Sequence, residues 1–202
     1  GVPISAWSKN AITPGGSFQS CYTTACDEKI SEASTAGEDM IANDPNFPTD
    51  LFQFLFGVPN TSYQQIKDQA TIITNCATQL TSASTGLLWV TDTACNPRGD
   101  VGSAANPVLV VGDVGAAGRI TINANEEFYG LLFLFSPGTP PTSGELKTNG
   151  TAHVHGAVMA YADLKLNGNF TLEYDGDVLS ALRNSPSTRA LARIPGSWSD
   201  VQ

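Results

Sequence analysis

Two histidines lie close together in the sequence and are candidates for metal chemistry. His153 and His155 are separated by one residue, so on a β-strand both imidazoles point to the same face. A His-x-His pair supplies half of many metal sites, and Asp163 or Glu173 could supply a third ligand. Because nothing in the spacing selects either carboxylate, we expect the pair to serve in packing or hydrogen bonding. The sequence therefore predicts no metal site.

Several aspartates lie beside glycines, in an arrangement that calcium could use. Asp175 and Asp177 are separated by a glycine, and Asp92 and Asp100 lie on either side of a cysteine. The distal glutamate of an EF-hand is absent from this pattern. Asp177 is also well placed to be the N-cap of a helix over residues 178–182. We therefore expect no cofactor, with calcium as the alternative.

Two short motifs have a surface function in other proteins. Arg98-Gly99-Asp100 spells an integrin-type tripeptide in a glycine-rich loop, so attachment to a host receptor is one alternative. Asn60, Asn149 and Asn169 each open an Asn-x-Ser/Thr triplet, the acceptor pattern for N-glycosylation. In turns rich in Asn and Thr such triplets arise by chance, and we expect Asn149 and Asn169 to be turn residues.

The sequence offers little for catalysis. It contains no Gly-x-Ser-x-Gly, no His-Glu-x-x-His and no Gly-rich phosphate loop followed by Lys-Ser/Thr. Glu126 and Glu127 are adjacent, so on a strand their carboxylates face opposite sides. Seven aromatic residues fit a core or an interface better than a sugar-binding platform; they are Phe52, Phe54, Phe56, Phe128, Tyr129, Phe133 and Phe135. We expect a protein that is not an enzyme.

Four cysteines indicate an oxidising compartment. An even, small number in a chain of this composition predicts two disulfides. A zinc site is disfavoured because no Cys-x-x-Cys is present and the histidines lie far along the chain. Of the three possible pairings we favour the local one, Cys21 with Cys26 and Cys76 with Cys95, which needs no long-range coincidence.

Composition narrows the class of protein. The chain has 202 residues, enough for one large domain with its own core. Only 14% of residues are charged and the net charge is −9, which argues against binding to nucleic acid or to anionic lipid. Low charge with many small polar residues, 19 Gly and 12 Pro suits a secreted or surface protein made largely of strands and turns.

The first half of the chain shows mainly helical patterns. Apolar residues recur at helical spacing between Cys26 and Asp44. Residues 49–57 begin with an N-cap and end at a glycine, which predicts a short helix that buries several aromatic rings. Thr61 or Ser62 could cap a longer helix that continues to residue 73. Residues 87–90 read as a buried strand.

The second half repeats itself with a displacement of 26 residues. Asn123 matches Asn149, Gly130 matches Gly156, and a third, partial copy starts at Leu164. Each unit alternates apolar and polar residues, turns at Asn-Gly or Asn-Ala, and alternates again. A single unit cannot bury its apolar face, whereas stacked copies can. The repeat predicts a small solenoid-like or meandering sheet.

Together these patterns predict an α+β fold with two disulfides, in which a helical and loop-rich amino-terminal half packs on a carboxy-terminal strand repeat. We expect one head of residues 1–202, with a helix- and loop-rich part over 1–95, a strand repeat over 106–176, and a capping helix and tail over 177–202. The fold should depend on the two cysteine pairs and on Trp89, Gly130, Gly156 and Trp198.

Five short phrases occur in a characteristic order: Asp50–Val58, Gly86–Val90, Phe128–Phe133, His155–Val158 and Pro195–Trp198. Together they resemble the soluble part of a PilX-type minor pilin of the bacterial type IV pilus, over about residues 45 to 200. Members of that family begin with a long apolar helix that anchors them in the inner membrane. Residues 1–44 carry little of the resemblance, and we expect an anchor helix upstream of Gly1.

The resemblance implies a structural protein rather than an enzyme. It implies a subunit that joins other minor pilins and the major pilin in a complex that primes pilus assembly, sits at the tip, and supports twitching motility and adhesion to a surface or host ligand. Such a subunit is held in the inner membrane before assembly and is then exposed in the periplasm and on the pilus. The alternative is a secreted carbohydrate-binding or carbohydrate-cleaving β-solenoid domain, which predicts an exposed line of aromatic and acidic side chains along the repeat.

Overall fold

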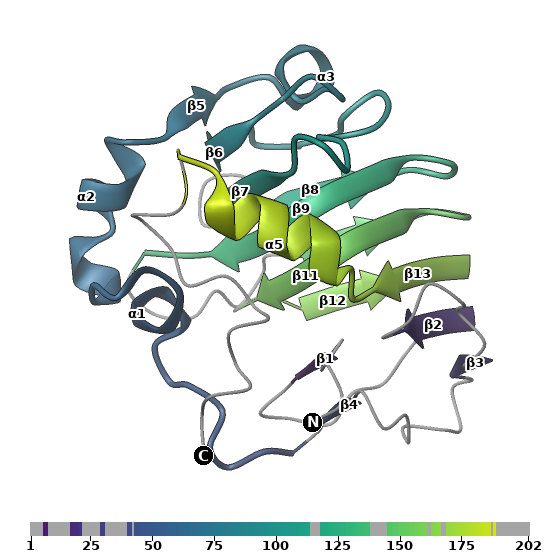
Figure 1. The fold of residues 1–202 in the computed structure, drawn as a ribbon, viewed down its shortest axis with the longest axis horizontal. Coiled ribbons are helices and arrows are strands. Elements are labelled where there is room, and N and C mark those ends of the chain that lie inside the picture. Colours follow the sequence, from purple (N-terminus) through teal and green to yellow (C-terminus); the bar gives the residue numbers. More distant parts are fainter. Residues whose placement is uncertain are drawn as a thin grey trace.

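The chain folds into a β-solenoid of stacked, mostly parallel strands with short helices on one face (Figure 1). The computed structural model describes residues 43–113, 118–137, 145–160, 169–186 and 188 in full. It also gives the backbone of strand segments 6–7, 17–21, 29–30, 40–41 and 163–166.

Thirteen strands are defined in these residues. The strands are β1 (Ala6–Trp7), β2 (Ser17–Cys21), β3 (Lys29–Ile30), β4 (Met40–Ile41), β5 (Thr71–Ile73), β6 (Gly86–Val90), β7 (Val108–Asp113), β8 (Arg119–Ile122), β9 (Glu127–Phe135), β10 (Glu145–Thr148), β11 (His153–Ala160), β12 (Asp163–Leu166) and β13 (Asn169–Glu173). The helices are α1 (Leu51–Phe56), the 3-10 turn η1 (Asn60–Ser62), α2 (Gln64–Lys67), α3 (Cys76–Gln79) and α5 (Gly176–Asn184).

The strands form two principal sheets that face each other across the solenoid. One sheet has eight strands in the order β3-β2-β13-β11-β9-β7-β6-β5, and all of its pairs are parallel except β2 with β3. The second sheet has three parallel strands in the order β12-β10-β8. The short strands β1 and β4 form a separate parallel pair. Each strand of the small sheet is followed in the chain by a strand of the large sheet, so one coil contributes to both.

The 26-residue repeat is the spacing between two coils. In the large sheet Gly156 of β11 lies beside Gly130 of β9, and in the small sheet Glu145 lies beside Arg119, each pair 26 residues apart. The next coil is shorter, because His153 pairs with Thr171, only 18 residues further along. The turn between the two strands of a unit is therefore a corner between sheets rather than a hairpin.

Glycines at the matched positions let neighbouring coils approach closely. Gly130 and Gly156 have φ angles of 137° and 134°, in the region that residues with a Cβ rarely adopt. A Cβ on Gly130 would lie 1.9 Å from the carbonyl oxygen of Val108, and one on Gly156 would lie 2.0 Å from that of Gly130. Backbone fills the space that a side chain would need.

Alternation along the strands divides the core into two apolar layers. Side chains at one set of positions fill the interior of the solenoid, including Phe128, Leu132 and Val154. Side chains at the intervening positions, such as Leu131 and Phe133, point to the outer face of the large sheet. There α1 and α5 cover them, and Figure 1 shows α5 lying across β9 and β11.

The short helices begin and end where local sequence predicts. Asp50 caps α1 by accepting a hydrogen bond from the Gln53 backbone, and Gly57 ends it with a φ of 73°. The helix predicted over residues 49–57 and the strand predicted over 87–90 are both confirmed. The longer helix predicted to reach residue 73 is wrong, because α2 ends at Lys67 and residues 71–73 form strand β5.

The predicted α+β class is wrong. The amino-terminal half is not a helical unit packed on a sheet, because β5, β6 and β7 extend the same parallel sheet that the repeat forms. Between Cys26 and Asp44, where a helix was expected, residues 29–30 and 40–41 are strands. Helical spacing of small apolar residues is a weak signal in this stretch, since strand pairing with distant segments outweighs local preference.

The expectation of two disulfides is also corrected. The part of the chain that the structure describes contains one, Cys76–Cys95. Cys21 ends strand β2, and Cys26 lies outside the described residues.

Within the described ranges, every helix is too short or too polar to cross a membrane.

Candidate functional site

The outer face of the large sheet carries a partly open cluster of polar side chains. It lies at the amino-terminal ends of β9, β11 and β13, before the point where α1 and α5 cover the sheet. Glu127 of β9 pairs in register with His153 of β11, and Tyr129 pairs with His155. His155 in turn lies beside Glu173 of β13. We call these five residues the His–Glu cluster.

The rings of the cluster are stacked on one another. Tyr129 and His155 lie with their ring centres 4.5 Å apart and their planes within 4° of parallel. His153 and His155 stack at 3.9 Å with an angle of 25°. The Tyr129 hydroxyl donates a hydrogen bond to the Glu127 carboxylate, which therefore has a fixed position beside the rings. The stack spans two coils of the solenoid.

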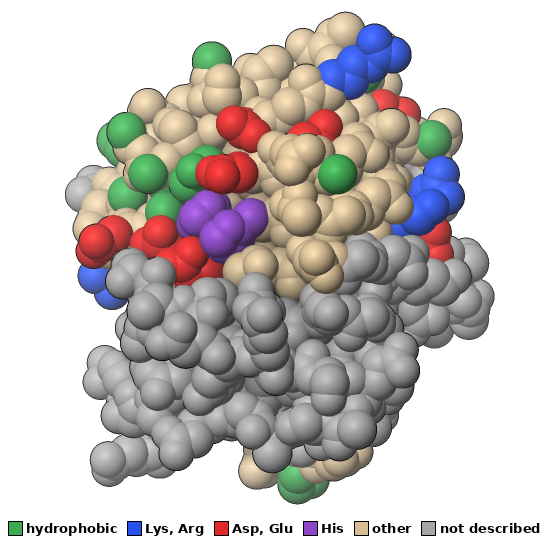
Figure 2. Space-filling view, turned by 90° about the vertical axis from the view of Figure 1, so that its right-hand side faces the viewer, with side chains coloured by type: hydrophobic (Ala, Val, Ile, Leu, Met, Phe, Trp, Pro, Cys, Tyr) green, Lys and Arg blue, Asp and Glu red, His purple; other side chains and the backbone are tan. Residues whose placement is uncertain are grey.

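Both carboxylates approach the histidine nitrogens. Oε2 of Glu173 lies 3.1 Å from Nε2 of His153 and 3.3 Å from Nδ1 of His155. Oε2 of Glu127 lies 3.5 Å from Nε2 of His155. One nitrogen from each histidine and one Glu173 oxygen lie within 4.8 Å of one another, close enough to hold one metal ion. Figure 2 shows the two histidines together at the surface next to acidic side chains.

The surroundings perturb the protonation of several members. The hydrogen bond from Tyr129 stabilises the Glu127 carboxylate and lowers its pKa, and the same bond raises the pKa of Tyr129 to about 12. Burial lowers the pKa of His153, the charge of His155 adds to this effect, and the charges of the two carboxylates oppose it. His153 is therefore mainly neutral at pH 7, the form in which imidazole binds metals.

Of the two carboxylates considered as third ligands, the fold brings only Glu173 to the histidines. Asp163 begins β12 in the small sheet, where it pairs with Glu145, whereas both histidines lie in the large sheet. The 18-residue coil places Glu173 beside His155. That shorter spacing was the missing signal, because a constant 26-residue repeat does not align the two residues.

The aspartates considered for calcium have structural roles. Asp175, rather than Asp177, is the N-cap of α5, since its carboxylate accepts hydrogen bonds from the Asp177 and Val178 backbones. The predicted cap was thus displaced by two residues. Asp92 accepts from the Cys76 and Ala94 backbones. The fold does not gather these carboxylates at one point.

The Arg98–Asp100 tripeptide is tied to the coil above it. Asp100 is exposed, and its carboxylate accepts a hydrogen bond from the backbone of Glu127 at 2.9 Å. The Gly99 backbone donates to the Glu126 carboxylate, which also accepts from the Asn123 backbone. Glu126 therefore lies in the corner network and Glu127 in the His–Glu cluster, so the two adjacent carboxylates serve different sites.

The asparagines of the repeat form a ladder at the corner between the sheets. Nδ2 of Asn149 donates to Oδ1 of Asn123 at 3.4 Å, and Nδ2 of Asn123 donates to Oδ1 of Asn96 at 2.7 Å. Sequence analysis missed Asn96, which lies 27 residues before Asn123 and so almost at the repeat distance. Of the other triplet asparagines, Asn60 lies in η1, and Asn169 is the exposed first residue of β13.

Most of the aromatic residues belong to the core. Trp89 is fully buried and lies within 6.5 Å of the rings of Phe52, Tyr63 and Phe135. Phe56 and Phe133 join the same layer, Phe54 lies at its edge, and Phe128 points into the solenoid. Tyr129 alone of the seven belongs to the His–Glu cluster. Trp198 lies outside the described residues.

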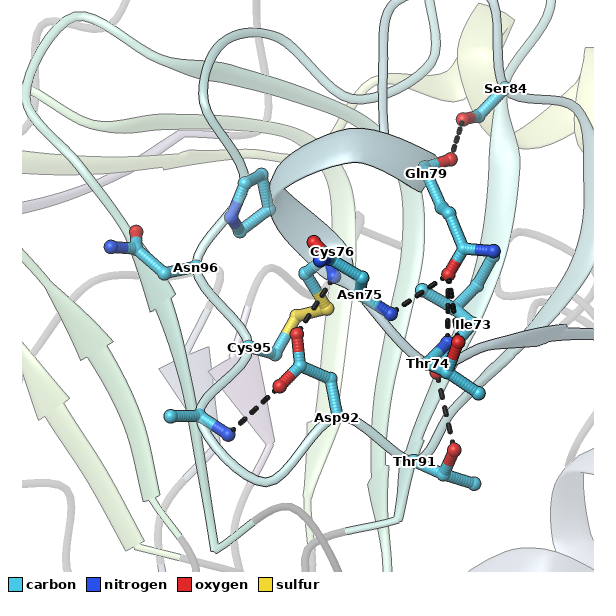
Figure 3. The surroundings of a disulfide bond; sticks show 12 residues. Ile73, Thr74, Asn75, Cys76, Gln79, Ser84, Thr91, Asp92, Cys95 and Asn96 are labelled. Carbon is cyan, nitrogen blue, oxygen red and sulfur yellow. Dashed lines mark hydrogen bonds between the residues drawn. A yellow bond between two sulfur atoms is a disulfide. The ribbon is translucent and has the colours of Figure 1, made fainter.

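The described disulfide closes one end of the interior (Figure 3). Cys76 begins α3, Cys95 follows β6, and both are buried in the inner apolar layer. The Asp92 carboxylate lies beside the bond and accepts from the Cys76 backbone at 2.8 Å. The backbone of Cys95 bridges to Ile120, so the disulfide connects α3 to the first coil of the repeat.

Comparison with protein-family models, with curated proteins and with solved structures found no match to this chain.

Proposed function

We propose that the chain is the head of a PilX-type minor pilin. In this account it is a structural subunit that joins other minor pilins and the major pilin in a complex at the pilus tip, where it supports assembly, twitching motility and adhesion. It has no catalytic role. It is exposed on the pilus and in the periplasm, and it is held by an inner-membrane anchor before assembly.

The proposal rests on one observation, the ordered set of phrases that resembles PilX-type minor pilins. Four of the five phrases lie in described residues and fall in α1, β6, β9 and β11. Although they are far apart in the sequence, they supply one contiguous apolar layer, with Phe52, Trp89 and Phe133 in mutual contact range. Short resemblances that converge on one packing unit favour a shared fold over chance agreement.

The β5 end of the large sheet is the surface that we assign to a neighbouring pilin head. Among the described strands, β5 pairs with β6 alone and so has a free edge. Ile72 on this strand is 40% exposed and is the exposed large hydrophobic residue of the described chain. An edge strand with an exposed apolar side chain is suited to pairing with a second protein.

Deletion of the gene from its bacterium tests the proposal. We expect the deletion strain to lose surface pili and twitching, and complementation with the wild-type gene to restore both. Complementation with Ile72→Lys should restore neither, because a charge on the free edge blocks pairing. Asn184→Lys adds the same charge to an exposed position of α5 and should behave as wild type. Normal piliation and motility in the deletion strain would refute the proposal.

One observation favours the second candidate, a carbohydrate-binding solenoid. Tyr129, His155 and His153 form a stacked line flanked by Glu127 and Glu173, which is the kind of exposed aromatic and acidic row that this function requires. A glycan array with the purified protein tests it. Binding that is lost in Tyr129→Ala would support this function, and an array without signal would refute it.

A further inference from the structure

We propose that His153, His155 and Glu173 form a binding site for a transition-metal cation, for which zinc is the best match. The site goes beyond the proposed pilin function and does not depend on it. Both histidines of the chain lie in it, although the sequence spacing alone gives no reason to expect a third ligand there.

The distances between the three side chains suit a tetrahedral ion. Zinc binds histidine nitrogen and carboxylate oxygen at about 2.0–2.2 Å, so two of its ligand atoms lie about 3.3 Å apart. Oε2 of Glu173 lies 3.1 Å from Nε2 of His153 and 3.3 Å from Nδ1 of His155. Small rotations of the two rings would complete the arrangement, since all three ligand atoms already lie within 4.8 Å of one another.

The histidine nitrogens lack the partners that buried polar atoms require. Nε2 of His153 and Nε2 of His155 are both closed off from solvent, and neither forms a hydrogen bond of acceptable geometry within the described part of the chain. The neighbouring carboxylates are near in distance but lie off the direction of an N–H bond. An unsatisfied buried nitrogen is costly, and a bound cation removes that cost for His153 directly.

A second shell already orients the histidine that would bind through Nδ1. With Nδ1 of His155 toward the ion, its Nε2–H faces Glu127, whose Oε2 is 3.5 Å away. Glu127 is itself held by the hydroxyl of Tyr129, which also stacks on the His155 ring. A carboxylate behind a ligating histidine is the usual support of such sites, because it fixes the tautomer and the ring orientation.

The ligand types select the class of cation. Calcium and magnesium prefer six or more oxygen ligands, whereas two imidazoles and one carboxylate suit zinc and its first-row neighbours. In the described residues, the salt bridges of Glu127 and Glu173 involve only the two histidines, so no lysine or arginine neutralises either carboxylate there. The side chains of His153 and Glu173 are 28% and 12% exposed, which leaves a fourth position open to water.

Titration of the tag-free protein with Zn²⁺ tests the site directly. We expect one equivalent to bind, measured by competition with a chelating dye. Because the chain has only two histidines, imidazole NMR of the wild-type protein gives one signal set for each, and both should shift together up to one equivalent. Unchanged imidazole signals on addition of Zn²⁺ would overturn the proposal.

Variants separate the site from incidental binding. We expect His155→Ala to weaken Zn²⁺ binding more than 100-fold, the isosteric Glu173→Gln at least 10-fold, and the second-shell Glu127→Gln about 10-fold or more. Asp68→Asn removes an exposed carboxylate from α2, outside the cluster, and should leave the affinity unchanged. Circular dichroism confirms that each variant is folded. A folded Glu173→Gln that binds Zn²⁺ as tightly as wild type would contradict the assignment.

Discussion

Gly130 gives the sharpest test of how the coils pack. Its Cα lies opposite Val108 in the β7–β9 pair, and its φ is 137°. We expect Gly130→Ala to destabilise the protein strongly, because the new Cβ would lie 1.9 Å from the Val108 carbonyl oxygen and 2.8 Å from its nitrogen. Both atoms belong to the backbone, so no side-chain rotation can relieve the contact.

Two effects add to give the size of the loss. Holding a residue with a Cβ at this φ costs about 1–3 kcal/mol. Separating two paired strands to make room for a methyl group costs about 1–3 kcal/mol more, as overpacking does elsewhere in protein cores. The free energy of unfolding should therefore fall by about 2–6 kcal/mol, a large part of the total of about 5–15 kcal/mol for a typical domain.

Gly99 offers a matched control for the first effect alone. Its φ is 130°, close to that of Gly130, yet nothing lies within 4 Å of a Cβ placed there. We expect Gly99→Ala to cost only about 1–3 kcal/mol. Urea denaturation followed by circular dichroism measures both variants, and a difference of 2 kcal/mol separates their midpoints by about 1 M. Equal midpoints for the two variants would refute the close-approach argument.

Three further perturbations test individual parts of the fold. Replacing Cys76 and Cys95 by Ala should lower the free energy of unfolding by about 3 kcal/mol, because the bond closes a loop with a sequence separation of 19; chemical denaturation without reductant measures it, and an unchanged midpoint would contradict it. Asn123→Ala should cost about 1–2 kcal/mol, since it removes the middle of the asparagine ladder, and thermal unfolding should show a lower Tm. Asp175→Ala should cost about 1 kcal/mol through loss of the α5 N-cap, and Asp177→Ala should cost less; the reverse order in urea would show that the cap is assigned wrongly.

The repeat was predictable because it has two independent signals in the sequence. Asn123 with Asn149 and Gly130 with Gly156 share one displacement, and both pairs are adjacent in the structure. Each pair also has a physical reason to recur, the side-chain ladder for the asparagines and the close backbone approach for the glycines. Local rules for caps likewise placed the end of α1 at Gly57.

The class of fold was not predictable from local pattern. Asn-Gly between two alternating segments is a hairpin signal, yet here the chain turns a corner into the other sheet and pairs with the next coil. Strand β5 follows a helical pattern that begins near Thr61, and it becomes a strand by pairing with β6. Pairing partners that are distant in sequence decide both outcomes, and a local window contains no information about them.

The His–Glu cluster shows the same division. That His153 and His155 share one face followed from strand geometry alone. Constant application of the 26-residue displacement also aligns Glu127 with His153 and Tyr129 with His155, as the structure has them. Glu173 could not be found in this way, because it enters through a coil that is eight residues shorter.

Light scattering on the protein mixed with the other minor pilins of its bacterium tests the central proposal most directly. The measurement is made twice, once with the purified heads and once with the proteins as their genes encode them, in detergent. The account predicts a complex of fixed stoichiometry whose mass falls to that of the separate subunits with Ile72→Lys and is unchanged with Asn184→Lys. A protein that stays monomeric in both preparations would contradict the account.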